Sequence, residues 1–346
     1  GLSITGMGRD ISWGLYIAQF TFLVGVAASA VVIVLPYYIH NIEQFGRITV
    51  LGEFVAVSAV VMTILFVFVD LGQPARVLNI MLYPSPQSVL FWDMIVLSVY
   101  FLLNLIIGWQ VLEAERKEEP PPSWVKLLVM LSIPWAISIH TVTAFIYSGL
   151  GARPFWLTAI LAPRFLASAF SSGPAFLILL CMALRRVSGF DTGKEAIQKI
   201  AQIVAYALVI NIFFLLVELF TVFYGSPPEH KLSFQYLLFG LEGHAALAPF
   251  AWLSIILSIT AASLFIHPAA RRNEKILSFG SAAVIISVWI EKGIGLVIAG
   301  FVPSPLGEIS RYIPTFPEIL ICTGIYALGF FILTVFLKIV VTVKKE

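Results

Sequence analysis

Ionisable side chains interrupt the apolar runs of this sequence at a few places, and these places are the first candidates for chemistry. Asp70 ends one apolar run and Asp93 begins the next, while His140, Glu218 and Glu291 lie inside later runs. A charged side chain at the centre of a bilayer costs about 2.5–3.5 kcal/mol on insertion scales. Such residues persist where they are paired, hydrated or used, and Asp, Glu and His also exchange protons.

Helical spacing gives some of these groups polar neighbours. Tyr147 follows His140 by seven residues, so both side chains are expected on one helical face. Tyr16 and Gln19 share a face of an earlier helix by the same reasoning. The simple alternative is a set of unrelated core side chains and hydrated interfacial ones. Taken together, the groups favour a polar pocket that is reached from one side of a membrane.

Adjacent charges and two loops extend the candidate set. Glu291 and Lys292 are neighbours in the sequence, and consecutive residues of a helix do not face each other, so we expect each to have a partner on another helix. Loops that contain Gly and Pro carry Arg76 and Arg153 just beyond two helix ends. Segment 155–162 is apolar but too short to span a bilayer, which predicts an interfacial or re-entrant piece.

The elements that must hold these groups are membrane-spanning helices. Of the 346 residues, 60% are hydrophobic and 12% are charged, well below the roughly 25% charged residues of soluble domains. About 20 apolar residues cross a bilayer as a helix, and lipid cannot satisfy the open backbone groups of a strand. We predict an all-α fold, a polytopic membrane helical bundle, in one domain over 1–346. The nine predicted helices cover residues 15–38, 49–70, 88–110, 124–147, 164–184, 197–223, 243–266, 276–302 and 317–341.

The distribution of Lys and Arg predicts the orientation. The N-terminal end and the loops after the second, fourth, sixth and eighth helices hold six of these residues, and the opposite ends hold fourteen. Cytoplasmic loops are enriched in Lys and Arg, so the second set and the C-terminus are expected in the cytoplasm. The N-terminal residues and most of the ionisable groups named above then lie toward the outer side.

The sequence also limits the cofactors that this chain holds itself. Cys181 and Cys322 both lie in apolar runs, and two thiols are too few for an iron–sulfur cluster, which takes four ligands. No Cys-x-x-Cys-His motif for covalent haem is present. A net charge of +2 with scattered basic residues does not favour nucleic acid. We therefore expect no metal site, no iron–sulfur cluster and no covalently bound haem in this chain.

An amphipathic redox molecule fits the predicted pocket. A quinone has an apolar tail and two carbonyl oxygens, it enters from lipid, and its redox chemistry moves protons that Asp, Glu and His accept. Two other classes remain open. An ion or small-solute transporter would use the same carboxylates to bind a cation or proton. A haem-b cytochrome needs two facing histidines, for which His140 and His244 are the outer pair.

Longer motifs around these residues resemble the NrfD/polysulfide-reductase membrane-subunit family. The motifs that carry the resemblance are WGLYIAQ at 13–19, DLGQPAR at 70–76, FWD at 91–93, HTVTAFIYSG at 140–149, PRFLASAF at 163–170, WIEKGIGLVIAG at 289–300 and PSPLGE at 303–308. They run along almost the whole chain. Within the family they are most similar to DsrP, also called HmeB, the quinone-interacting subunit of the DsrMKJOP complex of sulfate reducers.

The resemblance implies a fold, a function and a set of partners. The implied fold has two four-helix units plus an additional helix and no prosthetic group. The implied function is to exchange electrons between menaquinol and a periplasmic ferredoxin-like iron–sulfur subunit of the DsrO type, in sulfate or sulfite reduction. Further expected partners are a cytochrome c, a haem-b membrane subunit and a cytoplasmic iron–sulfur subunit, in the cytoplasmic membrane of a prokaryote. Relatives usually have one more helix before the position of Gly1, so a preceding segment is expected.

The resemblance and the polar pattern together define the candidate site. Asp70, His140 and Glu291 are assigned to proton exchange. The residues assigned to quinone contact are Tyr16, Gln19, Arg76, Asp93, Tyr147, Arg153, Glu218 and Lys292. The outer loops are the predicted docking face for the iron–sulfur partner, because apolar side chains expected to be exposed there, Phe155, Trp156 and Leu306, suggest a covered surface.

Overall fold

The computed structural model describes residues 2–38, 45–225 and 228–343, and this part of the chain is almost entirely helical. Nine helical segments within it are long and apolar enough to cross a membrane. They are Leu15–Tyr38 (α1, Leu15–Ala27, and α2, Ser29–Tyr38), α3 (Gly46–Asp70), α5 (Val89–Arg116), α6 (Ser123–Ser148), α7 (Leu161–Ser188), α8 (Lys194–Gly225), α10 (Ala248–Ile266), Glu274–Ala299 (α12, η5 and α13) and α14 (Phe316–Val343). The all-α membrane bundle predicted from hydropathy is thereby confirmed.

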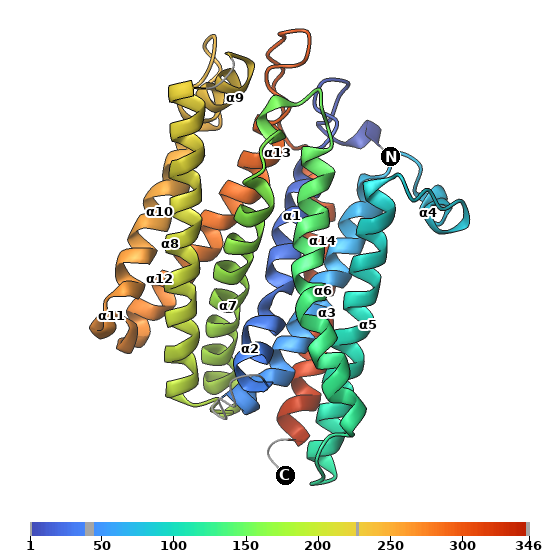
Figure 1. The fold of residues 1–346 in the computed structure, drawn as a ribbon, viewed down its shortest axis with the longest axis vertical. Helices are drawn as coiled ribbons and strands as arrows, with labels where there is room; N and C mark the ends of the chain where they lie inside the picture. The colour runs from blue at the N-terminus through green and yellow to red at the C-terminus, as the bar shows by residue number, and fades with distance from the viewer. Residues whose placement is uncertain (1, 39–44, 226–227, 344–346) are drawn as a thin grey trace.

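The helices form two four-helix units (Figure 1). The first contains α1 with α2, α3, α5 and α6, and the second contains α7, α8, α10 and the segment built from α12 (Glu274–Val288), η5 (Trp289–Gly295) and α13 (Leu296–Ala299). The two units meet where α1 contacts α7 and η5. The additional helix, α14, packs against α3 of the first unit. This arrangement places α1 at the centre of the molecule, and the apolar window of its span is 100% buried.

Short elements and loops cover one end of the bundle, called here the outer end. It carries residues 2–14 and the loops 71–88, 149–160, 228–247 and 300–315, opposite the end at which α14 finishes (Figure 1). The short elements in these loops are η1 (Leu2–Ile4), η3 (Pro74–Arg76), α4 (Asn79–Leu82), η4 (Pro154–Trp156) and α9 (Pro228–Leu238). At the other end lies α11 (Pro268–Arg272). Residues 344–346, which include two lysines counted for the orientation, lie outside the described residues.

The N-terminal segment is fastened across the outer end by the start of α14. The buried Glu318 carboxylate accepts a hydrogen bond from the backbone N–H of Gly6 at 3.1 Å and another from the Tyr312 hydroxyl. The same hydroxyl lies 2.7 Å from the backbone nitrogen of Leu15, which donates to it. Burial and the bond to Glu318 raise the pKa of Tyr312, so its hydroxyl keeps its proton at neutral pH. This contact network fixes where α1 begins.

One helix begins several residues later than hydropathy predicts. Hydropathy placed the seventh helix at 243–266, whereas α10 begins at Ala248. The reason is local backbone geometry: Glu242 and Gly243 both have positive φ angles, of 49° and 83°, and Leu241 pairs with His244 in an isolated antiparallel bridge. Residues 241–244 therefore form a tight turn at the outer end, and His244 does not sit at bilayer depth opposite His140.

Candidate functional site

A charged cluster occupies the outer half of the second unit. Arg164, in the first turn of α7, donates hydrogen bonds to Glu218 of α8 and, at 2.7 Å, to Glu291 of η5. The other Glu291 oxygen accepts from the Asn211 amide at 3.0 Å. Side-chain exposure is only 11% for Arg164 and 3% for Glu218, so this is a buried ion network. These four residues and Lys292 are called here the paired cluster.

Lys292 enters the space between the units. Its Nζ lies 3.4 Å from the backbone oxygen of Phe165 and 4.3 Å from the centre of the Phe165 ring. It also approaches α1, because a Cβ placed on Gly25 would be 3.4 Å from this nitrogen. Glu291 and Lys292 thus find partners on other helices, as the sequence predicted. Both lie on the π-helical stretch η5, a type of irregularity that often marks functional positions.

A small cavity adjoins the paired cluster. It has a volume of about 50 Å³, and Arg164 and Glu291 line it together with apolar side chains of α8, α9 and α10. Phe155 and Phe234 are among the apolar residues that line it. The space holds one or two water molecules but no quinone ring. We therefore interpret the paired cluster as a hydrated ion network rather than as the headgroup site itself.

Two of the predicted site residues in the first unit make hydrogen bonds across helices. Asp93, near the start of α5, accepts from the Thr143 hydroxyl of α6 at 2.7 Å. The Tyr147 hydroxyl of α6 is hydrogen-bonded to Thr21 of α1. All four side chains are buried. These bonds connect α6 to α5 and to α1 in the outer half, and the second one orients the Tyr147 side chain.

Three other predicted residues carry buried polar atoms without a hydrogen-bond partner in the described part of the chain. They are Tyr16, through its hydroxyl, Asp70, through Oδ1, and His140, through both ring nitrogens. His140 is only 1% exposed. A buried polar atom left without a partner costs about 1–3 kcal/mol, so such atoms in a native protein usually serve a ligand or water. Tyr16, Asp70 and His140 are called here the open cluster, because they share unpartnered buried atoms and not because they contact one another.

Electrostatic and ring contacts connect the two clusters. The Asp70 carboxylate acts electrostatically on the hydroxyls of Tyr16 and Tyr147, and the Lys292 charge acts on His140. The Tyr147 ring lies edge-on to the Phe165 ring at 5.8 Å between centroids, and Lys292 stands over that same ring. The polar outer half is therefore one connected region that crosses the boundary between the units.

Some predicted site residues lie away from this region or connect other segments of the bundle. Gln19 is buried, but its Oε1 accepts hydrogen bonds from Trp289 and Tyr326 at 2.8 and 2.7 Å, so it links α1, η5 and α14. Arg153 donates to the backbone oxygens of Phe301 and Asp10 and so connects three outer segments. Burial lowers its pKa, although a guanidinium stays charged.

Arg76 and Glu53 fall outside the clusters for different reasons. Arg76 is exposed in the loop 71–88, and the structure does not bring it to either cluster. Glu53 is fully buried on α3 and both of its carboxylate oxygens lack a partner in the described part of the chain. It precedes Asp70 by 17 residues, which places it about 25 Å away along the helix, in the other half of the bundle. It cannot contact a ligand that the open cluster holds.

The expectation that Phe155 and Trp156 are exposed is wrong. Trp156 is completely buried, and its indole N–H donates to the backbone oxygen of Leu296 at 3.0 Å. It packs against Trp13, Tyr147 and Phe301 at centroid distances of 5.7, 5.1 and 5.1 Å. Phe155 and Trp156 are therefore both packed inside the bundle. Trp156 and the three rings around it, called here the aromatic roof, pack together at the outer end of the bundle.

Sequence reasoning missed Arg164, the centre of the paired cluster. Pro163 precedes it and the predicted helix begins at 164, which is typical of a loop cation, whereas α7 begins at Leu161. The available signal was that two carboxylates, Glu218 and Glu291, lay at matching depth, while Lys292 was the one cation predicted near them. Thr143, Thr21 and Asn211 were also missed, because neutral polar residues in a helix carry no comparable sequence signal.

The donor set gives no indication of a metal site. Within residues 2–38, 45–225 and 228–343, no three His, Cys, Asp or Glu side chains come together in a way that could hold a metal ion. The open cluster instead offers an imidazole, a carboxyl oxygen and a phenol hydroxyl, all buried. This set can accept and donate protons and can hydrogen-bond a carbonyl or hydroxyl oxygen.

Comparisons with known proteins place the chain in a family. A model of the family described as polysulphide reductase, NrfD, matches residues 3–304. One subunit of the selenate reductase of Mesobacillus selenatarsenatis is 24% identical over 273 residues, which are 69% of this chain and 64% of that protein. The Hdr-like menaquinol oxidoreductase integral membrane subunit of Archaeoglobus fulgidus is 22% identical over 68% of this chain and 58% of its own length. The chain thus spans less than two thirds of either relative.

A third relative aligns over more of its length. The menaquinone reductase, integral membrane subunit, of Nitratidesulfovibrio vulgaris is 23% identical over 340 residues, 92% of this chain and 80% of that protein. The family match includes eight of the nine spanning segments and every residue of both clusters. Because the match covers most of the sequence, the chain belongs to the NrfD family of polysulphide reductase membrane proteins.

Proposed function

We propose that this chain is the quinone-interacting membrane subunit of a respiratory electron-transfer complex and that the open cluster receives the quinone headgroup. The observation that carries the proposal is the set of buried polar atoms without a protein partner on Tyr16, Asp70 and His140. Two relatives are named as menaquinol oxidoreductase and menaquinone reductase membrane subunits, which supports menaquinone as the substrate.

The chemistry of the open cluster matches quinol oxidation. Menaquinol releases two protons and two electrons when it becomes menaquinone. The neutral imidazole of His140 accepts one proton and the Asp70 carboxylate accepts the other, while the Tyr16 hydroxyl donates a hydrogen bond to a quinone oxygen. The two electrons must leave to a partner, since this chain offers no redox centre among the described residues. The reverse sequence reduces the quinone.

The proposed electron acceptor or donor is an iron–sulfur subunit, ferredoxin-like and of the DsrO type, at the outer end. This proposal includes the orientation derived from Lys and Arg, with the outer end in the periplasm and the C-terminus in the cytoplasm of a prokaryote. A role in sulfate or sulfite reduction, with a cytochrome c, a haem-b membrane subunit and a cytoplasmic iron–sulfur subunit, is part of the same proposal. It rests on the resemblance of the motifs to DsrP.

The docking face is supported by exposed apolar side chains at the outer end. Leu306 is 76% exposed, and Met81 and Leu82 of α4 are 62% and 67% exposed. Photo-crosslinkers at 82 and 306 should capture a cluster-bearing protein in native membranes. Crosslinkers at Val187, also exposed but at the opposite end, serve as the control. If only position 187 captures the redox partner, the partner docks at the end opposite the outer end and the proposed docking face is wrong.

The central test removes the proton-exchanging groups one at a time. His140→Ala and Asp70→Asn should each lower menaquinol oxidation by the intact complex by about 10²–10⁴-fold, the range that general acid–base catalysis contributes. The complex should still assemble. His267→Ala, an exposed histidine at the other end of the bundle, is the matched control and should leave turnover unchanged. Normal turnover in both site variants would remove the open cluster from the reaction.

A further inference from the structure

A second region with binding properties lies at the end of the bundle opposite the open cluster. Residues at the start of α8 and around α11 line a notch of about 380 Å³. Its basic side chains are Lys194, Lys199, Arg271 and Arg272, and its acidic side chain is Glu195. The excess of positive charge lies at the N-terminus of the 32-residue helix α8, whose backbone dipole also favours an anion.

Backbone contacts hold the notch in shape. Arg271 donates through Nη1 to the backbone oxygen of Phe265 at 2.6 Å, and its own carbonyl accepts from the Gln198 amide at 2.6 Å. These bonds connect α11 to α8 and keep the basic side chains together. Lys199 is partly buried in the notch, whereas Arg272 is exposed at its rim. The arrangement suits a phosphate group that approaches from the membrane surface.

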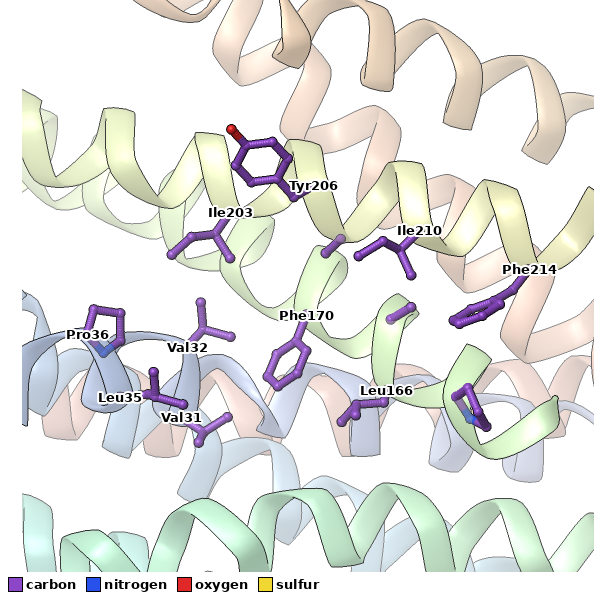
Figure 2. Close-up of a pocket in the computed structure, with 13 residues that line it drawn as sticks. Val31, Val32, Leu35, Pro36, Leu166, Phe170, Ile203, Tyr206, Ile210 and Phe214 are labelled. Carbon is purple, nitrogen blue, oxygen red and sulfur yellow. The ribbon is translucent and has the colours of Figure 1, made fainter. Parts of the chain in front are cut away.

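An apolar groove follows α8 on the side that faces α2 and α7 (Figure 2). It has a volume of about 550 Å³ and lies between α2, α7 and α8, with Leu35, Phe170 and Ile210 among its lining residues. From Ile203 to Phe214 it follows eleven residues of α8, which corresponds to about 16 Å. Polar atoms are almost absent from its surface, so its occupant along this length is hydrocarbon.

One hydrogen bond joins the notch to the groove. The Gln202 amide, in the lining of the notch, donates to the hydroxyl of Tyr206, in the lining of the groove, at 3.2 Å. Figure 2 shows the Tyr206 ring over α8 with its hydroxyl turned away from the centre of the groove. A molecule with an anionic head and a long apolar chain would therefore meet basic groups first and hydrocarbon one helical turn later.

We propose that the notch and the groove together bind one anionic phospholipid, with its phosphate in the notch and an acyl chain in the groove. A transmembrane helix of a partner is too large, because a helix about 10 Å wide fills roughly 1,200 Å³ over the same length. A quinone tail fits the groove less well, because the polar end of the groove is the notch, which lies at the end of the bundle opposite the open cluster. The outer end of the groove finishes at Pro163 and Phe214, and the open cluster lies on other helices.

The first experiment tests the headgroup. The full chain, purified in neutral detergent, is titrated with phosphatidylglycerol or with phosphatidylcholine of identical chains, and bound lipid is counted by native mass spectrometry. Phosphatidylglycerol should bind at least tenfold more tightly, and this preference should shrink as salt rises. The double variant Lys199→Gln with Arg272→Gln should bind it about thirtyfold more weakly, since each basic group near a lipid surface contributes about fivefold.

A matched control keeps the charge change but moves it away from the notch. Lys126→Gln with Lys338→Gln removes two exposed lysines from other helices and should change affinity less than twofold. Equal loss in both double variants, or equal binding of the two lipids, would overturn the headgroup site. Millimolar inorganic phosphate should not displace the lipid; displacement would show that the notch is a site for free phosphate.

The second experiment tests whether the acyl chain of the lipid lies in the groove. Ala207→Phe fills the groove and should weaken binding of long-chain phosphatidylglycerol several-fold, while a short-chain phosphatidylglycerol is unaffected. Ala327→Phe, on the exposed face of α14, is the control. If Ala207→Phe changes neither lipid, the acyl chain does not lie in the groove. If menaquinone displaces the lipid, and Ala207→Phe weakens menaquinone instead, the groove belongs to the quinone tail and the proposal is wrong.

Discussion

The paired cluster and the open cluster differ in how their buried polar atoms are satisfied. In the second unit, Arg164 is bound to Glu218 and Glu291, and Glu291 to Asn211. In the first unit, the buried polar atoms of the open cluster have no partner in the described part of the chain. Burial is similar in both regions, so depth alone does not distinguish them. The paired cluster is held together by its own charges, although Asn211 Oδ1 lacks a partner in the described part of the chain, whereas we propose that a bound molecule completes the open cluster.

The comparison separates two consequences of a substitution. Breaking a complete ion network leaves a charge uncompensated, so the fold should suffer first. Removing a polar atom that has no partner costs the protein little, so the fold should persist and the bound molecule should be affected. Variants of the two clusters, and of the aromatic roof, therefore test the contrast.

Arg164→Ala should have the largest effect on stability. The change leaves two buried carboxylates without their cation, a loss of about 3–5 kcal/mol for a buried pair. We expect most of the protein to aggregate on extraction, measured as the monodisperse fraction in fluorescence-detected size-exclusion chromatography. Arg76→Ala, which removes an exposed arginine, should behave like the unmodified chain. A stable Arg164→Ala protein that lacks turnover would move the chemistry into the paired cluster.

An apolar replacement of the whole network makes the same contrast sharper. Arg164→Met combined with Glu218→Leu and Glu291→Leu removes all three charges together, and such replacements are often neutral or stabilising. This triple variant should therefore extract better than Arg164→Ala alone. If it folds and still oxidises menaquinol, the paired cluster is structural. If it folds and is inactive, both clusters take part in the reaction.

Gly300→Ala should have the next largest effect, at the aromatic roof. A Cβ on Gly300 would lie 2.0 Å from the Trp156 ring, so the ring must move or the helix must shift. Overpacking of this kind costs about 1–3 kcal/mol. We expect a lower melting temperature in detergent, together with weaker quinol binding, because Trp156 packs on Tyr147. Gly151→Ala, with open space around it, should change neither quantity.

Tyr147→Phe and Tyr16→Phe should differ in a small but diagnostic way. Tyr147→Phe breaks the bond to Thr21 and should lower the unfolding free energy by about 1 kcal/mol. Tyr16→Phe removes a hydroxyl without a partner, so stability should be unchanged while the KM for menaquinol rises. Thermal melts and quinol titrations of the two variants check this pair. Equal destabilisation by both would mean that Tyr16 has a structural partner, such as a fixed water.

Hydropathy predicted the number of spanning segments because bilayer thickness sets a minimum length for each apolar run. It predicted their ends less well. Helix α5 continues to Arg116 through charged residues, since Arg116 and Lys117 pair with Glu113 and the turn still forms in water. Backbone conformation decided the start of α10, where Glu242 and Gly243 form a turn that apolar periodicity does not record.

The candidate site was predictable in its residue types but not in its pairing. Asp70, Asp93, His140, Tyr147 and Glu291 follow from the cost of burying polar groups. Which of them would be paired could not be predicted, because pairing depends on how α7 and η5 meet α8 and α1. Arg164 shows the difficulty: a cation next to Pro163 looks like a loop residue until the helix that contains it is seen to begin three residues earlier.

The contact between the N-terminal segment and the start of α14 has a consequence for biogenesis. Gly6 and Glu318 are 312 residues apart, so their bond cannot form until the ribosome has delivered the start of the last helix to the membrane. Glu318 lies beyond the region that the family match covers, residues 3–304, yet Glu318 acts electrostatically on Tyr16 in the open cluster. Insertion of eight spans would therefore leave the outer end without this contact, and under the proposed function a chain whose synthesis is unfinished would not yet react with quinone.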